Sequence, residues 1–122
     1  MQQKVPISKQ ITSYNHSGRI GVMIEIACET IKPFEDDGFS IFTHDMAKHI
    51  AAEDPKDISE LLQQPFIKQP EITVRQLIER QILKYEENMK VCRFIRWDIE
   101  NTTHAPDDLP PKSPVTAMKV VK

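Results

Sequence analysis

The stretch Gly18-Arg19-Ile20-Gly21-Val22-Met23-Ile24-Glu25-Ile26-Ala27 alternates apolar side chains with other residues along its length. Successive side chains of an extended chain point to opposite faces, so its isoleucines and valine share one side. This period of two predicts a β-strand with one apolar face. His16-Ser17-Gly18 in front of it predicts a hairpin turn, because glycine accepts a positive φ, and Ile11–Asn15 is expected to form the partner strand.

Two main helices are predicted after this strand. Asp36 or Asp37 is expected to cap the first helix. Its apolar stripe recurs every three or four residues: Phe39, Phe42, Met46 and Ile50. Asp54-Pro55 is expected to end this helix and to begin a short helical run from Lys56 to Leu62.

The second main helix is predicted from the capping box Thr73-Val74-Arg75-Gln76. Gln64–Pro70, which precedes it and is bracketed by prolines, is expected to be an extended connection. Asn88 is expected to end the helix in a left-handed conformation.

A last strand is predicted from the apolar residues that follow. Alternation places five of them on one face: Met89, Val91, Ile95, Trp97 and Ile99. Cys92 and Phe94 fall on the other face, so this strand is expected to be covered on both sides. The predicted order of strand, strand, helix, short helix, helix and strand indicates an α+β fold: a small antiparallel three-stranded sheet with helices packed on one face.

Length and composition indicate one folded domain. The chain has 122 residues, a net charge of -2 and a pI of about 6.1, which argues against a protein that binds nucleic acid through a general basic field. We expect a flexible lead-in at 1–10, a core domain at 11–100 and a proline-rich flexible tail at 101–122, whose last residues from Val115 are mildly apolar and basic. The sequence shows no apolar stretch of about 20 residues and no secretory signal, so the protein is expected to be neither membrane-bound nor secreted. Its two cysteines are expected to be reduced, half-buried thiols.

The residues that carry chemistry elsewhere have simpler interpretations here. No glycine-rich phosphate loop and no nucleophile motif occurs, so we expect no enzyme and no cofactor. Asp45 and His49 are read as a helix-surface pair rather than metal ligands, and no metal site is expected. Glu35-Asp36-Asp37 is read as a capping acidic turn rather than a cation site.

Several segments together resemble the core module of the translation elongation factor Ts family. The strand from Gly18 resembles the family pattern up to Cys28-Glu29-Thr30. Six anchors follow the family's order over roughly residues 13–100: Ser13-Tyr14-Asn15-His16, Arg19-Ile20-Gly21-Val22, Ala47-Lys48-His49-Ile50-Ala51-Ala52, Gln64-Pro65-Phe66-Ile67-Lys68, Thr73-Val74-Arg75-Gln76-Leu77-Ile78 and Glu87-Asn88-Met89-Lys90-Val91-Cys92-Arg93-Phe94. Members of that family promote release of GDP from elongation factor Tu. The resemblance therefore implies elongation factor Tu as a partner.

The resemblance also implies which residues contact that partner. They are the loop residues Thr30, Ile31, Lys32, Pro33 and Phe34, together with His49, which matches a family histidine at the partner interface. The loop departs from the family pattern, because Ile31-Lys32 stands where the family has an Asp-Phe pair. We also expect the small N-terminal three-helix module to be missing, and only Glu53–Gln63 to replace a long helical insertion.

Two functions stay open at this point. One is an elongation factor Ts-like protein that binds elongation factor Tu and modulates its GDP/GTP exchange, with weakened exchange activity. The alternative is a non-exchange structural or interaction subunit of a larger assembly. The uncovered face of the sheet is expected to form a homodimer or to be covered by another protein, with Met23 and Phe94 in that contact. The expected compartment is the cytoplasm or an organellar matrix.

Overall fold

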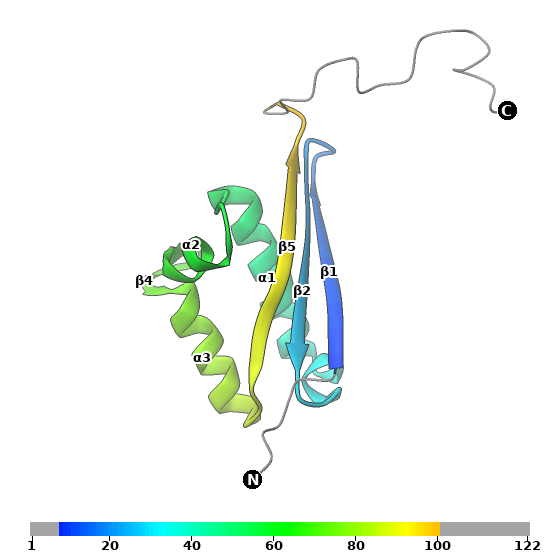
Figure 1. The fold of residues 1–122 in the computed structure, drawn as a ribbon, viewed down its shortest axis with the longest axis vertical. Helices are drawn as coiled ribbons and strands as arrows, with labels where there is room; N and C mark the ends of the chain where they lie inside the picture. Colours follow the sequence, from blue (N-terminus) through cyan, green and yellow to red (C-terminus); the bar gives the residue numbers. More distant parts are fainter. Residues whose placement is uncertain (1–7, 101–122) are drawn as a thin grey trace, which may run out of the picture.

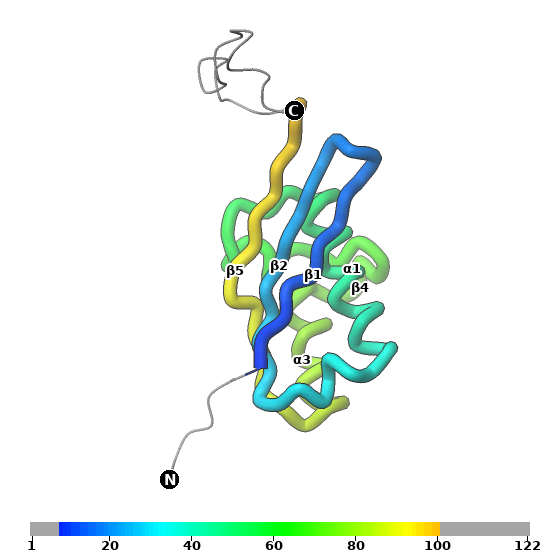
Figure 2. The backbone as a smooth tube through the Cα atoms, turned by 90° about the vertical axis from the view of Figure 1, so that its right-hand side faces the viewer, coloured from blue at the N-terminus to red at the C-terminus, as the bar shows by residue number. Residues whose placement is uncertain are grey.

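The computed structural model describes residues 8–100, so residues 1–7 of the predicted lead-in at 1–10 and the whole predicted tail at 101–122 lie outside the described residues. The elements are β1 (Ser8–His16), β2 (Ile20–Cys28), the 3-10 helix η1 (Lys32–Glu35), α1 (Asp37–Glu53), α2 (Ile58–Gln63), β3 (Pro65–Phe66), β4 (Gln69–Thr73), α3 (Val74–Tyr85) and β5 (Met89–Asp98). The three long strands form an antiparallel sheet in the order β1-β2-β5, and β3 and β4 form a separate hairpin. All helices lie on one side of the three-stranded sheet (Figures 1 and 2), which confirms the predicted α+β fold. No helix within residues 8–100 is long and apolar enough to cross a bilayer.

The first hairpin has the turn that the sequence predicts. Ser17 and Gly18 both have positive φ, 56° and 73°, in the three-residue loop that joins His16 of β1 to Ile20 of β2. The Gly18 N–H donates to the side-chain oxygen of Asn15 at 2.7 Å, and the Arg19 N–H donates to the His16 carbonyl at 2.9 Å. β1 begins at Ser8, three residues before its predicted start, because Ser8 to Gln10 continue the pairing with β2.

The helix boundaries follow most of the predicted signals. Thr73 and Gln76 form a complete capping box at the start of α3, as predicted. Asp54 ends α1 in a left-handed conformation, and α2 begins at Ile58 with Asp57 as its cap, two residues after the predicted Lys56. The prediction for Asn88 is wrong: Glu86 is the left-handed residue that ends α3.

The core lies between the sheet and the helices. The buried side chains of β2 (Val22, Ile24 and Ile26) face the predicted apolar stripe of α1. Phe39 of that stripe is fully buried, and its ring lies 5.1 Å from the ring of Phe42 and 5.4 Å from that of Tyr85. The stripe is therefore core, as the sequence predicts.

β5 contains an irregularity that the sequence analysis did not predict. Ile26 pairs with Val91 and Glu25 pairs with Arg93, so Cys92 is an extra residue, a β-bulge. A bulge moves every later side chain to the opposite face. Met89 and Val91 are buried against the helices, whereas Ile95 and Trp97 are exposed on the open face and Ile99 is exposed beyond the end of the strand, so the prediction of one shared face is wrong.

The bulge also corrects the placement of Phe94. Phe94 pairs with buried Ile24 and packs against the core, on the side that the helices cover. Met23 pairs with Ile95 and is half exposed, on the open side. The two residues predicted to share the open face therefore lie on opposite faces of the sheet.

Candidate partner-binding surface

The loop between β2 and α1 is a short, tightly folded connection. Its residues Lys32 to Glu35 form the 3-10 helix η1, which the fixed φ of Pro33 favours at its first turn. The Phe34 N–H donates to the Ile31 carbonyl at 3.0 Å, and the Asp36 N–H donates to the Pro33 carbonyl at 3.1 Å. These two bonds fix the tip of the loop in one compact conformation.

The turn between α3 and β5 holds the first half of this loop. The Glu87 carboxylate accepts a hydrogen bond from the Thr30 N–H at 3.0 Å, and its second oxygen accepts one from the Thr30 hydroxyl. In return, the Asn88 N–H donates to the Glu29 carboxylate at 2.8 Å. The two segments, 57 to 59 residues apart in sequence, are therefore joined by hydrogen bonds in both directions.

The end of the loop is held by the last residue of α3. The Tyr85 hydroxyl donates to the Asp36 carboxylate, so this N-cap residue of α1 makes no side-chain bond to the helix itself. Burial, together with the negative charge of Asp36, raises the pKa of Tyr85 to about 12. Burial and the carboxylate of Glu87 raise the pKa of the Cys28 thiol, just before the loop, to about 12, so this thiol stays protonated at neutral pH.

The loop residues named from the sequence divide into two groups. Pro33 is buried, and Phe34 is half-buried with its ring 5.4 Å from the Phe39 ring in an edge-to-face contact. Thr30, Ile31 and Lys32 are exposed, and Ile31 leaves 54% of its surface to solvent. The loop thus presents one branched apolar side chain next to one cation on an anchored base.

His49 does not belong to this exposed surface. Its side chain is fully buried in α1, its Nε2 lies 2.8 Å from the Gln64 side-chain oxygen, and its Nδ1 lies 3.3 Å from the Ile67 N–H. Its ring stacks on the ring of Phe66 at 5.9 Å. The predicted helix-surface pair of Asp45 and His49 does not form, because the Asp45 carboxylate makes an ion pair with the Lys68 ammonium at 3.0 Å.

The open face of the sheet is a second exposed apolar surface. Beside Met23 it carries Ile11, for which no face was predicted, and Ile95 and Trp97, which were predicted to share a face with Met89 and Val91; Trp97 is 71% exposed. Two shallow hollows, of about 360 and 300 Å³, flank Met23 and Ile95. Gly21, opposite Trp97, leaves the second hollow open because no atom lies within 4 Å of where its Cβ would be. We call these residues the open-face patch.

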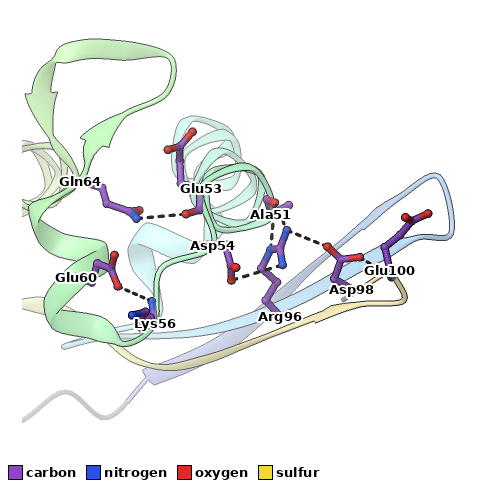
Figure 3. Close-up of polar contacts among 9 residues, drawn as sticks. All are labelled: Ala51, Glu53, Asp54, Lys56, Glu60, Gln64, Arg96, Asp98 and Glu100. Carbon is purple, nitrogen blue, oxygen red and sulfur yellow. Dashed lines mark hydrogen bonds and ion pairs between the residues drawn. The ribbon is translucent and has the colours of Figure 1, made fainter. Parts of the chain in front are cut away.

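Arg96 connects the covered face of β5 to the end of α1 (Figure 3). Its guanidinium donates two hydrogen bonds to the Ala51 carbonyl, at 2.9 and 3.1 Å. The same group lies 3.5 Å from the carboxylates of both Asp54 and Asp98. A cation at a helix C-terminus satisfies its free carbonyls and complements the helix dipole, so this contact is structural.

No arrangement for a metal ion occurs in the described part of the chain: no three His, Cys, Asp or Glu side chains of residues 8–100 converge on one point. Both cysteines are free thiols, Cys28 buried and Cys92 half-buried.

Three curated proteins similar to this chain are each named elongation factor Ts, while no family model matches the chain. Elongation factor Ts of Solibacter usitatus is 31% identical over 72% of this chain and 63% of its own length. Elongation factor Ts of Clostridium novyi is 35% identical over 75% of this chain and 30% of its own length, and that of Thermodesulfovibrio yellowstonii is 29% identical over 75% and 68%. The chain thus spans between about a third and two thirds of the length of these relatives.

The Solibacter and Thermodesulfovibrio alignments also show a difference in length inside the matched region, whereas the Clostridium alignment, 92 residues over 75% of this chain, does not. The Solibacter alignment covers 133 residues, which exceeds the 122 residues of this chain. That relative therefore carries internal residues that have no counterpart here. The lack of a long insertion at Glu53–Gln63 stays a prediction.

Proposed function

We propose that this chain, which is related to the elongation factor Ts family through its core, binds elongation factor Tu and modulates its GDP/GTP exchange. The observation that carries the proposal is the anchored loop. Ile31 and Lys32 are exposed at its tip, while Glu87 binds its first half through Thr30 and Tyr85 binds its end through Asp36. A loop that is already ordered pays less conformational entropy on binding, and this favours its use as a contact. The compartment proposed for this activity is the cytoplasm or an organellar matrix, where the partner works.

The side chains at the tip favour a weak effect on nucleotide exchange. Bound GDP depends on backbone donors, a cation and a helix N-terminus of its protein, and an exchange factor acts by displacing one of these. Ile31 and Lys32 replace the acid and the aromatic ring of the family pattern, so the charge offered at this point is reversed. Coupling is reciprocal: a factor that lowers nucleotide affinity is itself bound less tightly when nucleotide is present.

A GDP-release assay on elongation factor Tu from the same host tests the proposal. The chain should bind the nucleotide-free partner and accelerate release only weakly, and the double change Ile31→Asp with Lys32→Phe should accelerate it further. Ile41→Asp is the matched control, because Ile41 is an isoleucine of similar exposure, 60%, on α1. The proposal is wrong if no binding is detected in either nucleotide state, and the role of the loop is wrong if both changes have the same effect.

A second candidate function is that of a non-exchange interaction subunit, and the open-face patch favours it. Exposed apolar surface on a sheet is a typical site of protein association, and its two hollows accept protruding side chains. A homodimer that pairs two such faces, or another protein that covers the face, fits this surface. Sedimentation velocity separates these cases. A homodimer sediments as a dimer without any added partner. If the protein stays monomeric at high concentration and does not bind elongation factor Tu, the face must be covered by a different protein.

A further inference from the structure

Buried His49 is the centre of a chain of hydrogen bonds that joins three parts of the fold. The Ile67 N–H, in the turn of the β3–β4 hairpin, donates to the Nδ1 atom of His49 at 3.3 Å. The Nε2 atom lies 2.8 Å from the Gln64 side-chain oxygen. Gln64 ends α2, and its side-chain nitrogen donates to the Glu53 carbonyl at the end of α1 at 3.4 Å. Its own carbonyl accepts the Val74 N–H at 3.0 Å, where α3 begins.

The direction of each bond fixes the protonation state of the ring. A backbone N–H can only donate, so Nδ1 must carry a lone pair. The Gln64 oxygen can only accept, so Nε2 must carry the hydrogen. One neutral tautomer of His49, with its hydrogen on Nε2, satisfies every hydrogen bond in this series. Among residues 8–100, no buried side-chain nitrogen or oxygen lacks a partner.

A doubly protonated ring does not fit this arrangement. Its Nδ1–H would point at the Ile67 N–H, which would place two donors against each other and leave one buried without an acceptor. An unmade buried hydrogen bond costs about 1–3 kcal/mol, and more for a charged group. We propose that neutral His49 is a latch that holds the β3–β4 hairpin on α1, and that protonation of its ring in acid releases the hairpin.

The charged groups around the ring do not compensate its protonation. Asp45 of α1 is paired with Lys68 of the hairpin, and Glu60 of α2 accepts the Lys56 N–H at 2.9 Å. Glu53 of α1 raises the pKa of His49, as does the bond to Gln64, but burial outweighs both and lowers it below 6.5. At the start of α3, the element reached through Gln64, Val74 is apolar and buried.

The sign of the pH effect follows from this depressed pKa. The unfolded or opened state binds the proton more readily than the closed state, so closure is fully favoured above pH 6.5 and weakens as the pH falls through that value. Each pH unit below 6.5 makes opening up to about tenfold more favourable, until the closed-state pKa is reached.

Amide hydrogen exchange measured by NMR tests the latch in the full chain. The protection factors of the Ile67 and Val74 amides, corrected for intrinsic exchange, should fall by up to about tenfold per pH unit below 6.5. The Ile24 amide in the central strand β2 is the internal reference and should change less. A constant ratio between the Ile67 and Ile24 protection factors from pH 7.5 to 5 would overturn the proposal.

Two further measurements separate the latch from a general effect of acid. His49→Gln should abolish the pH dependence at Ile67, whereas His44→Gln, which removes an exposed histidine from the same helix, should leave it intact. Nitrogen shifts of the wild-type rings require no variant to fold: His49 must show a protonated Nε2 and an unprotonated Nδ1 at pH 7.5. The opposite tautomer refutes the latch.

Discussion

The hydrogen bonds between Thr30 and Glu87 give the sharpest test of how the candidate loop is held. One carboxylate accepts both the N–H and the hydroxyl of Thr30. Hydrogen bonds to a charged acceptor contribute about 1.5–3 kcal/mol when shielded from water, and less where the donor residue is exposed, as Thr30 is. We therefore expect Glu87→Ala to lower the free energy of unfolding by about 1–2 kcal/mol.

The same change should weaken binding to elongation factor Tu, because a freed loop must be ordered again on binding. Ordering the backbone of one residue costs about 1–2 kcal/mol, and 1.4 kcal/mol corresponds to a tenfold change in affinity. A Kd about tenfold larger is expected in calorimetric titration of the partner.

Urea unfolding followed by circular dichroism checks the stability effect. Thr30→Val and the double variant complete a mutant cycle, with an expected coupling of about 0.5–1 kcal/mol, since the valine keeps the backbone bond and loses only the hydroxyl. Glu79→Ala, at an exposed acidic position of α3, is the matched control for loss of charge. The proposed hold of Glu87 on Thr30 is refuted if Glu87→Ala destabilises the fold no more than Glu79→Ala, or if the coupling energy is zero.

Three other predictions concern the rest of the structure. Arg96→Met should lower the free energy of unfolding by about 2–4 kcal/mol, because the Arg96 side chain is only 12% exposed and caps α1. Arg93→Met, at a 78% exposed arginine of the same strand, should change the free energy of unfolding little. Equal effects of the two changes in urea unfolding would contradict this prediction. Trp97→Lys should abolish self-association in sedimentation velocity without loss of fold, and a variant that associates like the wild type would exclude the open-face patch as the interface. At pH 8, Cys92 should react with a disulfide reagent while Cys28 stays unreactive until unfolding, since burial raises the pKa of Cys28 to about 12; fast reaction of both thiols in the folded state would be inconsistent with that burial.

The fold could be predicted from the sequence wherever a local pattern also decides burial. The alternation from Ile20 to Ile26 fixes which side of β2 meets the helices, and the stripe around Phe39 fixes which side of α1 meets the sheet. The capping box at Thr73 is likewise complete within four residues. In each case the residues that carry the signal are neighbours in the chain.

Contacts between distant segments could not be read in this way. Glu87 follows the end of α3 and looks like one more charged turn residue, yet it holds Thr30. Gln64–Pro70 was predicted as an extended connection, whereas it contains β3 and most of the β3–β4 hairpin, whose turn is fixed on buried His49. The apolar neighbours of His49 on α1 are compatible with its burial, but its two partners, Gln64 and the Ile67 N–H, come from segments 15 and 18 residues further along the chain.

The bulge at Cys92 decides which surface of this protein is apolar. Met89 and Val91 fill the core, while Trp97 is 71% exposed, and strict alternation would have forced all three to one side. The extra residue allows Met89 and Val91 to be buried and Trp97 to be exposed, because each side chain after the bulge points to the opposite face from the one that strict alternation gives. It thereby turns Arg96, not Trp97, toward the end of α1, where the guanidinium meets the Ala51 carbonyl. The same local irregularity therefore anchors α1 on one face of the sheet and exposes Trp97 in the open-face patch on the other. A partner that binds this patch would contact side chains whose position depends on the bulge and not on strict alternation.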